Sequence, residues 1–242
     1  MATVTEARPD ARRVVVVLTA AVLLLTVFYY FGRPGFYGSS GLSNWFEARI
    51  GGRLAEYPGV LAYAYWGFTS VVMRVLVPLG VVVWVIGARP GDFGFRVRGT
   101  LRHAWPYLAA YLVMVPVLVW ASSLDSFESY YPFYRRAADG GVAFWVYEGG
   151  YALQFLGVEA FFRGFLLFGL APVLGRWPAI AVMVVPYTMI HFGKPMPEAF
   201  AAIVAGFFLG WLALRSRSFV PGMFLHVAVA VTMDLLVISR IG

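Results

Sequence analysis

Long apolar runs separated by short polar segments dominate the chain. The first run, Val14–Phe31, contains only Thr19 and Thr26 as polar residues, and its length suffices to cross a bilayer as a helix. Arg12 and Arg13 precede it, as in a signal peptide. Because the run ends in aromatic residues and offers no small-residue cleavage site nearby, we expect a retained membrane anchor.

Six further apolar runs follow along the chain: Leu61–Ile86, Trp105–Ala121, Val142–Leu170, Pro178–His191, Phe200–Leu214 and Phe219–Ile238. The run from Val142 is longer than a bilayer requires, so we expect it to tilt, protrude or break near Gly149 and Gly150. Leu61–Ile86 contains Arg74 and Pro78 and predicts a kinked or partly interfacial helix. The predicted fold class is all-α, a polytopic helical membrane protein with about seven transmembrane helices.

Composition supports lipid as the solvent. The chain is 61% hydrophobic and 13% charged, whereas a soluble domain is nearer half apolar and a quarter charged. It has no cysteine, which excludes disulfides, thiolate metal sites and a cysteine nucleophile. The net charge of +7 comes from basic residues between the apolar runs, so we expect no nucleic-acid partner. Their bias places the N-terminus in the cytoplasm.

Two longer loops, Gly32–Gly59 and Ser122–Gly141, fall on the outer side in this topology. The second is rich in aromatic residues, which is typical of a segment at headgroup level. We divide the chain into anchoring helices and loops over residues 1–141 and a core that holds the site over residues 142–242.

Ionisable residues inside the apolar runs support this division, because each is costly in lipid and is a functional hypothesis by default. Arg74 is the only one in the N-terminal region. The others lie after residue 145 and are Glu148, Glu159, Arg163, His191, His226 and Asp234.

Glu159 and Arg163 are four residues apart, so they share a helix face and can form an ion pair. That pair is either a structural salt bridge or part of a site. His191 and His226 lie on different predicted helices. One carboxylate and two imidazoles can activate water directly, or through a metal such as zinc held by Glu159, His191 and His226 with one position open. Haem held between the two histidines is a further reading.

Three residues are auxiliary candidates. Glu148 precedes Glu159 by about three helical turns, and Tyr187 precedes His191 by one turn. Glu198 follows Pro197, which is typical of a helix start with an acid in its first turn. Alternatively, Glu198 leans over the site.

Three motifs in successive predicted helices together resemble one family. They are Glu159-Ala-Phe-Phe-Arg163-Gly164, Tyr187-x-x-x-His191, and Gly206-x-x-x-Gly210 leading to Ser218-Phe-Val-Pro221 and His226. Over Val142–Leu236 the chain resembles the CPBP family of intramembrane proteases, named for CAAX-processing and bacteriocin-processing members and also called Abi proteins. The resemblance implies that Glu159, Arg163, His191 and His226 are catalytic, with no cofactor required. It also implies a multi-pass protein of a bacterial cytoplasmic (inner) membrane.

The sequence departs from the family pattern at two positions. Val158 stands where the family usually has its first glutamate, and Ala230 stands where a polar residue usually follows the last histidine by four. Three outcomes stay open. Glu159 serves as the base, Glu148 or Glu198 substitutes for the missing glutamate, or the protein is an inactive relative that binds a partner helix.

The leading hypothesis is therefore an intramembrane endopeptidase that hydrolyses a peptide bond of a membrane-tethered or lipidated protein with Glu/His-activated water. A catalytically inactive scaffold or immunity protein on the same fold is the first alternative. A transporter is the second, since buried Glu, Arg and His also form proton relays, although the lack of an evident repeat counts against it.

Overall fold

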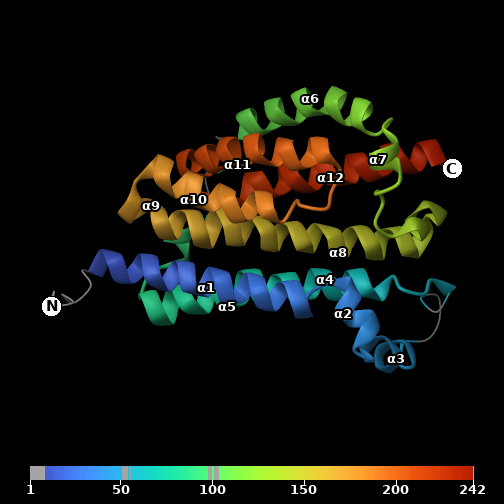
Figure 1. Cartoon of the computed structure of the whole chain (residues 1–242), viewed down its shortest axis with the longest axis horizontal. Helices are drawn as coiled ribbons and strands as arrows, with labels where there is room; N and C mark the ends of the chain where they lie inside the picture. The colour runs from blue at the N-terminus through green and yellow to red at the C-terminus, as the bar shows by residue number, and fades with distance from the viewer. Residues whose placement is uncertain (1–8, 51–53, 55, 98–99, 101–103, 242) are drawn as a thin grey trace.

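The computed structural model describes residues 9–50, 54, 56–97, 100 and 104–241, which contain helices and no strand. The elements are α1 (Pro9–Phe31), α2 (Pro34–Ser39), α3 (Leu42–Glu47), α4 (Leu61–Val71), η2 (Val72–Leu76), α5 (Val77–Gly80), η3 (Val81–Ile86), η4 (Pro90–Phe93), α6 (Ala104–Ala121), α7 (Asp125–Glu128), η6 (Arg135–Asp139), α8 (Gly141–Glu159), η7 (Ala160–Leu167), α9 (Phe168–Leu174), α10 (Arg176–Met189), α11 (Met196–Ser216) and α12 (Val220–Ile241). The long helices run roughly along one direction (Figure 1).

Six continuous helical stretches in the described residues are long and apolar enough to cross a membrane. They are Ala11–Phe31, Val60–Ile86, Ala104–Ala121, Gly141–Leu174, Met196–Ser216 and Val220–Ile241. Six of the seven predicted spans are thus confirmed, and the chain is a multi-pass membrane protein by helix length and composition.

The remaining predicted span, Pro178–His191, corresponds to α10, which has 14 residues and ends before His191. At 1.5 Å per residue it extends about 21 Å, less than the hydrocarbon core of about 30 Å. Segment 122–140 contains α7 and η6, and we call it the outer segment after the side of the membrane predicted for it. It reaches the turn that follows α10, where the Lys194 ammonium lies 3.5 Å from the Tyr131 hydroxyl. Its aromatic residues Phe127, Tyr131 and Tyr134 are buried in the protein. These three side chains pack against neighbouring helices, and the headgroup-level position of the segment stays a prediction.

The stretch Gly141–Leu174 lies centrally between the N-terminal helices and α10 to α12 (Figure 1). It does not break at Gly149 and Gly150, because α8 is continuous to Glu159. Instead Gly150 lets α8 approach α4 closely. A Cβ atom at Gly150 would lie 2.3 Å from the backbone oxygen of Tyr63, and one at Gly67 would lie 2.5 Å from the oxygen of Gly150. Small residues at helix contacts are typical of membrane bundles.

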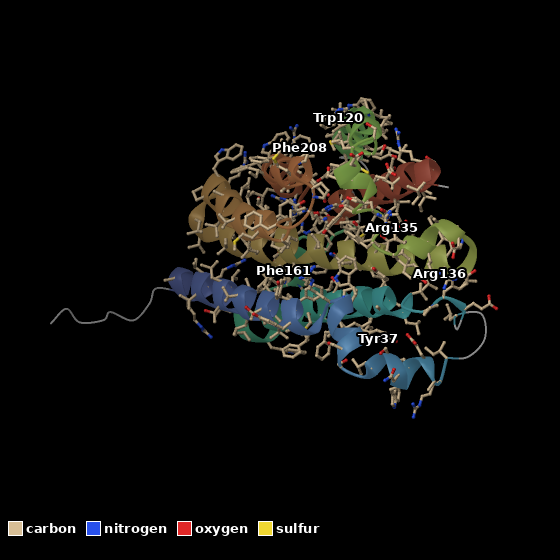
Figure 2. All side chains as sticks on the ribbon, turned by 45° about the vertical axis from the view of Figure 1, so that its right-hand side comes forward. Tyr37, Trp120, Arg135, Arg136, Phe161 and Phe208 are labelled. Atoms are coloured by element: carbon tan, nitrogen blue, oxygen red, sulfur yellow. The ribbon has the colours of Figure 1, made fainter. Side chains whose placement is uncertain are left out.

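The stretch widens into π-helical turns at η7, directly after Glu159. The largest core cluster packs Phe161 and Phe165 of η7 with Val17 of α1 and Met183 of α10. Figure 2 shows Phe161 inside the bundle at the level between α1 and the central helix. Helices from both predicted regions therefore share one core around the turns that follow Glu159.

The N-terminal helices are also tied to this core by polar contacts. The Arg13 guanidinium donates hydrogen bonds to the carbonyl oxygens of Phe168 and Gly169. Arg74, predicted as a costly charge within a span, is buried and stacks over the Phe28 ring at 3.7 Å. Such a cation–π contact offsets part of the cost of burying the guanidinium.

Candidate active site within the membrane bundle

Glu159 is the last residue of α8, and Arg163 lies one turn later in η7. The Arg163 Nη1 atom donates to Glu159 Oε1 at 2.9 Å, and both side chains are fully buried. The predicted ion pair is therefore present. A buried charge of this kind requires a partner, because removing either member leaves the other desolvated and uncompensated.

His226 of α12 meets the same carboxylate oxygen. Its Nδ1 atom lies 2.9 Å from Glu159 Oε1, so two helices converge on one acceptor. A carboxylate paired with arginine only accepts hydrogen bonds, so the Nδ1 atom carries the proton. That leaves Nε2 of His226 on the opposite side of the ring for chemistry. The Phe155 ring packs against the imidazole with centroids 4.3 Å apart.

Tyr187 of α10 brings the remaining predicted residues together. Its ring lies 3.9 Å from the Arg163 guanidinium carbon. The same ring lies 4.9 Å from the His191 ring and 6.4 Å from the His226 ring, measured between centroids. The structure therefore places Arg163 and both imidazoles around one phenol ring.

The His191 ring is oriented by its own helix. Its Nδ1 atom lies 2.8 Å from the Tyr187 carbonyl oxygen, which can only accept, so Nδ1 is the donor and Nε2 keeps a lone pair. His191 itself is buried at the turn that follows α10. Both histidines thus use Nδ1 to hold their orientation and present Nε2.

The auxiliary candidates lie in different places. Glu148 is buried, but the eleven residues that separate it from Glu159 on one helix amount to about 16 Å of helical rise. Near it, Asp234 accepts a hydrogen bond from the Tyr147 hydroxyl at 2.8 Å. Glu198 binds Lys194 and Tyr131. Neither auxiliary glutamate forms a hydrogen bond with Glu159 in the described part of the chain.

The two departures from the motif are apolar positions within the core. Val158 belongs to the largest cluster, with Phe161 and Phe165. Ala230 packs in a second cluster, with Tyr147 and Phe155. Position 158, where the family usually has its first glutamate, is thus occupied by a core valine, and Glu159 is the carboxylate that meets Arg163 and His226.

Two residues near Glu159 escaped the sequence reasoning. A Cβ atom at Gly222 would lie 3.1 Å from Glu159 Oε2 and 3.8 Å from the Tyr107 ring. Tyr107 also lines an apolar groove of about 410 Å³ between the starts of α6 and α12, with Phe224 and Leu225. Gly222 follows the Ser218-Phe-Val-Pro221 motif directly, and this position could have marked it as a site residue. No motif or charge in the sequence marks Tyr107.

A metal site requires at least three suitable side chains in one group. Among the residues that the structure describes, no three His, Cys, Asp or Glu side chains come together in this way. Glu159 Oε1 already accepts from Arg163 and His226. The predicted set of Glu159, His191 and His226 therefore does not fit a metal in this geometry, and we derive no step through one.

Comparison with known proteins agrees with this arrangement. No curated protein and no solved structure is detectably similar to the chain. The family model described as "Type II CAAX prenyl endopeptidase Rce1-like" matches residues 141–232. This segment contains Glu159, Arg163, His191 and His226, and the match confirms the family resemblance seen in the sequence. Residues 141–232 of this multi-pass membrane protein therefore form a domain of the Rce1-like type II CAAX prenyl endopeptidase (CPBP) family.

Proposed function

We propose that this protein is an active intramembrane endopeptidase that cleaves a membrane-tethered or lipidated protein. The observation that carries the proposal is the buried Glu159 carboxylate, which is bound by Arg163 and His226. The Tyr187 ring packs against Arg163, His226 and a second imidazole, that of His191. A carboxylate and imidazoles gathered inside a bundle are the groups that hydrolysis by activated water requires. The family that matches residues 141–232 is one of endopeptidases, which supports the same reaction class.

The two carboxylate oxygens of Glu159 have different roles in this proposal. Oε1 accepts hydrogen bonds from Arg163 and His226, which keep the carboxylate ionised and oriented. Oε2 is buried and has no hydrogen-bond partner among the described residues. We assign Oε2 to the attacking water, which donates one hydrogen to it while the His191 Nε2 lone pair accepts the other.

Hydrolysis then proceeds by addition of water and cleavage of the C–N bond. The water oxygen bonds to the scissile carbonyl carbon, and its proton passes to Glu159. His226 presents an Nε2–H group, when its ring is protonated, to the oxyanion that forms. The C–N bond breaks, and Glu159 returns the proton to the leaving amine. The products are a carboxylic acid and an amine.

A buried site of this kind suits a substrate that arrives within the membrane. The described residues form helices and short connections only, with no separate soluble unit that would recruit a soluble protein. We place the chain in a bacterial cytoplasmic membrane with its N-terminus inside, on the charge bias of the segments between the spans.

The proposal is tested by comparing membrane proteomes of three strains: a deletion strain, one that carries Glu159→Gln, and one that carries the wild-type chain. A precursor should accumulate in the first two and disappear in the third. Glu148→Gln is a matched control, because it alters a buried carboxyl group on the same helix that does not bind Glu159. Continued processing in both Glu159→Gln and His191→Ala membranes, at unchanged protein abundance, would show that the site is not catalytic.

A second candidate, a non-catalytic membrane scaffold or immunity protein, is favoured by the buried apolar Val158 and Ala230. The same strains separate the two functions. A scaffold keeps its biological effect in the Glu159→Gln strain and loses it only on deletion, whereas an endopeptidase loses it in both.

A further inference from the structure

We propose that Glu198, held by Lys194 and by Tyr131 of the outer segment, is a positioning residue that fixes the turn carrying His191. This inference rests on the proposed function, because it assigns these side chains to the orientation of a catalytic imidazole. None of the three touches Glu159, Arg163 or His226 through a hydrogen bond in the described structure.

His191 lies outside a regular helix, so its position depends on contacts that hold the turn around it. α10 ends at Met189, and His191 belongs to the turn between α10 and α11. Backbone groups at a helix end lack the full set of intrahelical hydrogen bonds, so the position of this turn depends on other contacts. Displacing a catalytic group by about 1 Å can cost roughly a hundredfold in rate.

Lys194 and Glu198 bridge this turn to the next helix. The Lys194 ammonium donates to Glu198 Oε1 at 2.7 Å, from one side of Pro195 to the first turn of α11. The Lys194 backbone N–H donates to the His191 carbonyl oxygen at 3.1 Å. The ion pair therefore holds Lys194, whose backbone is hydrogen-bonded to the backbone of His191. The two side chains keep 17% and 24% of their surface exposed, so the protein encloses most of the pair.

Tyr131 fixes the second oxygen of the same carboxylate. Its hydroxyl donates to Glu198 Oε2 at 2.6 Å, while only 3% of the residue is exposed. Burial raises the pKa of Tyr131 well above its usual value, and Tyr151 and Glu198 add to the effect. The phenol thus keeps its proton and stays the donor. Hydrogen bonds to a charged acceptor of this length are among the strong ones in proteins.

The outer segment is a firm support for Tyr131. Two residues further on, the Phe133 backbone oxygen accepts a hydrogen bond from the Tyr63 hydroxyl of α4, and the Phe133 N–H donates to the Tyr147 hydroxyl of α8. The Lys194 ammonium lies 5.9 Å from the centre of the Phe133 ring. The helices α4, α8 and α11 and the outer segment are therefore connected through polar contacts to the turn that holds His191.

The experiment measures conversion of the accumulated precursor in membranes at several precursor concentrations, which separates the maximal rate from the half-saturating concentration. Glu198→Gln and Tyr131→Phe should each lower the maximal rate, Glu198→Gln by roughly ten- to a hundredfold, with little change in half-saturation. Glu128→Gln, in an exposed acid of the same outer segment, is the matched control and should leave both quantities unchanged.

A charge exchange distinguishes positioning from simple loss of folding. Lys194→Glu or Glu198→Lys alone should reduce the rate, because each places two like charges together. The double variant should recover part of it, because the exchange restores an ion pair of opposite charges across Pro195. Wild-type rates for Glu198→Gln and Tyr131→Phe, with Glu159→Gln inactive, would overturn the positioning role alone. Activity of Glu159→Gln would instead overturn the proposed function.

Discussion

Gly222 shows how one missing side chain shapes the site. The glycine is buried, and its α-carbon faces Glu159 Oε2, the oxygen assigned to the attacking water. A methyl group placed there would lie 3.1 Å from that oxygen, which is tighter than ordinary van der Waals contact, and 3.8 Å from the Tyr107 ring. The glycine therefore keeps space beside the carboxylate open.

We predict that Gly222→Ala lowers precursor conversion by at least about tenfold, because displacing a reacting group by a fraction of an ångström is costly. Protein abundance should stay near that of the wild type. Quantifying precursor and product in membranes checks this expectation. Gly149→Ala is the matched control, because a Cβ atom at Gly149 meets nothing within 4 Å. Equal conversion by the two variants would show that the space at Gly222 is unimportant.

At this scale the sequence singled out the charged and imidazole residues that the structure gathers around Glu159 and Tyr187. Glu159, Arg163, His191 and His226 are ionisable residues within or at the end of apolar runs, so each was conspicuous without a structure. Tyr131, Lys194 and Tyr107 could not be found in this way. Tyr131 and Glu198 are separated by 67 residues, and their contact depends on how the outer segment folds back.

At the scale of elements, the tightest helix contact joins α4 to α8. Gly67 and Gly150 face one another with their backbones nearly touching, and a Cβ atom at Gly157 would lie 2.2 Å from the Ser70 hydroxyl oxygen. This contact fixes the helix that ends at Glu159. The sequence marked residues 149–150 as special and offered a helix break there as one of three possibilities, beside tilting and protruding. Glycine often breaks helices in water, whereas in lipid it is a helix-contact residue.

We predict that Gly150→Ala destabilises the protein by at least about 1–3 kcal/mol, the usual cost of overpacking, because the new methyl group would meet the Tyr63 backbone and no flexible side chain. Thermal unfolding in detergent measures the effect. The neighbouring Gly149→Ala variant changes the same helix without a clash, so it should unfold at the wild-type temperature. An unchanged midpoint for Gly150→Ala would contradict the packing described.

The hydropathy pattern located the six helical stretches that are long enough to cross a membrane in the described residues, but it also counted the 14-residue α10 as a seventh span. An apolar run looks the same whether it faces lipid along its full length or ends inside the protein beneath a folded segment. Only the buried positions of Phe127, Tyr131 and Tyr134 distinguish the two cases. The physical reason is that burial by protein and burial by lipid favour the same residue types.

At the scale of the whole molecule, the exposed surface is apolar where the spans lie. Large exposed residues include Trp84, Trp105, Trp120, Phe208 and Phe224. Figure 2 shows Trp120 and Phe208 on the α6 and α11 side of the bundle. An apolar surface of this extent requires lipid around it, which is the same conclusion that composition gave.

The predicted orientation is open to a direct test, because the chain has no cysteine of its own. We predict that a membrane-impermeant maleimide labels Ser126→Cys in intact spheroplasts and labels Arg89→Cys only after the membrane is opened. Both positions are exposed. The charge bias across the spans is the physical reason. The reverse labelling pattern would invert the topology and every side assignment derived from it.

The attachment of α6 has a consequence for how a peptide bond meets Glu159. This helix packs mainly on α12, and in the described structure its side chains reach the bundle by hydrogen bonds from Tyr107 to Ser216 and from Tyr111 to Thr232. Leu108 and Phe224 are exposed at the edge of the groove beside Gly222. The surroundings nearest to the Glu159 carboxylate on this side are therefore apolar side chains and lipid. In the proposed mechanism, an amide that approaches from here would shed its hydration shell before it reaches Glu159 Oε2, so the bilayer itself would carry out part of the desolvation that a soluble hydrolase performs with a closing loop.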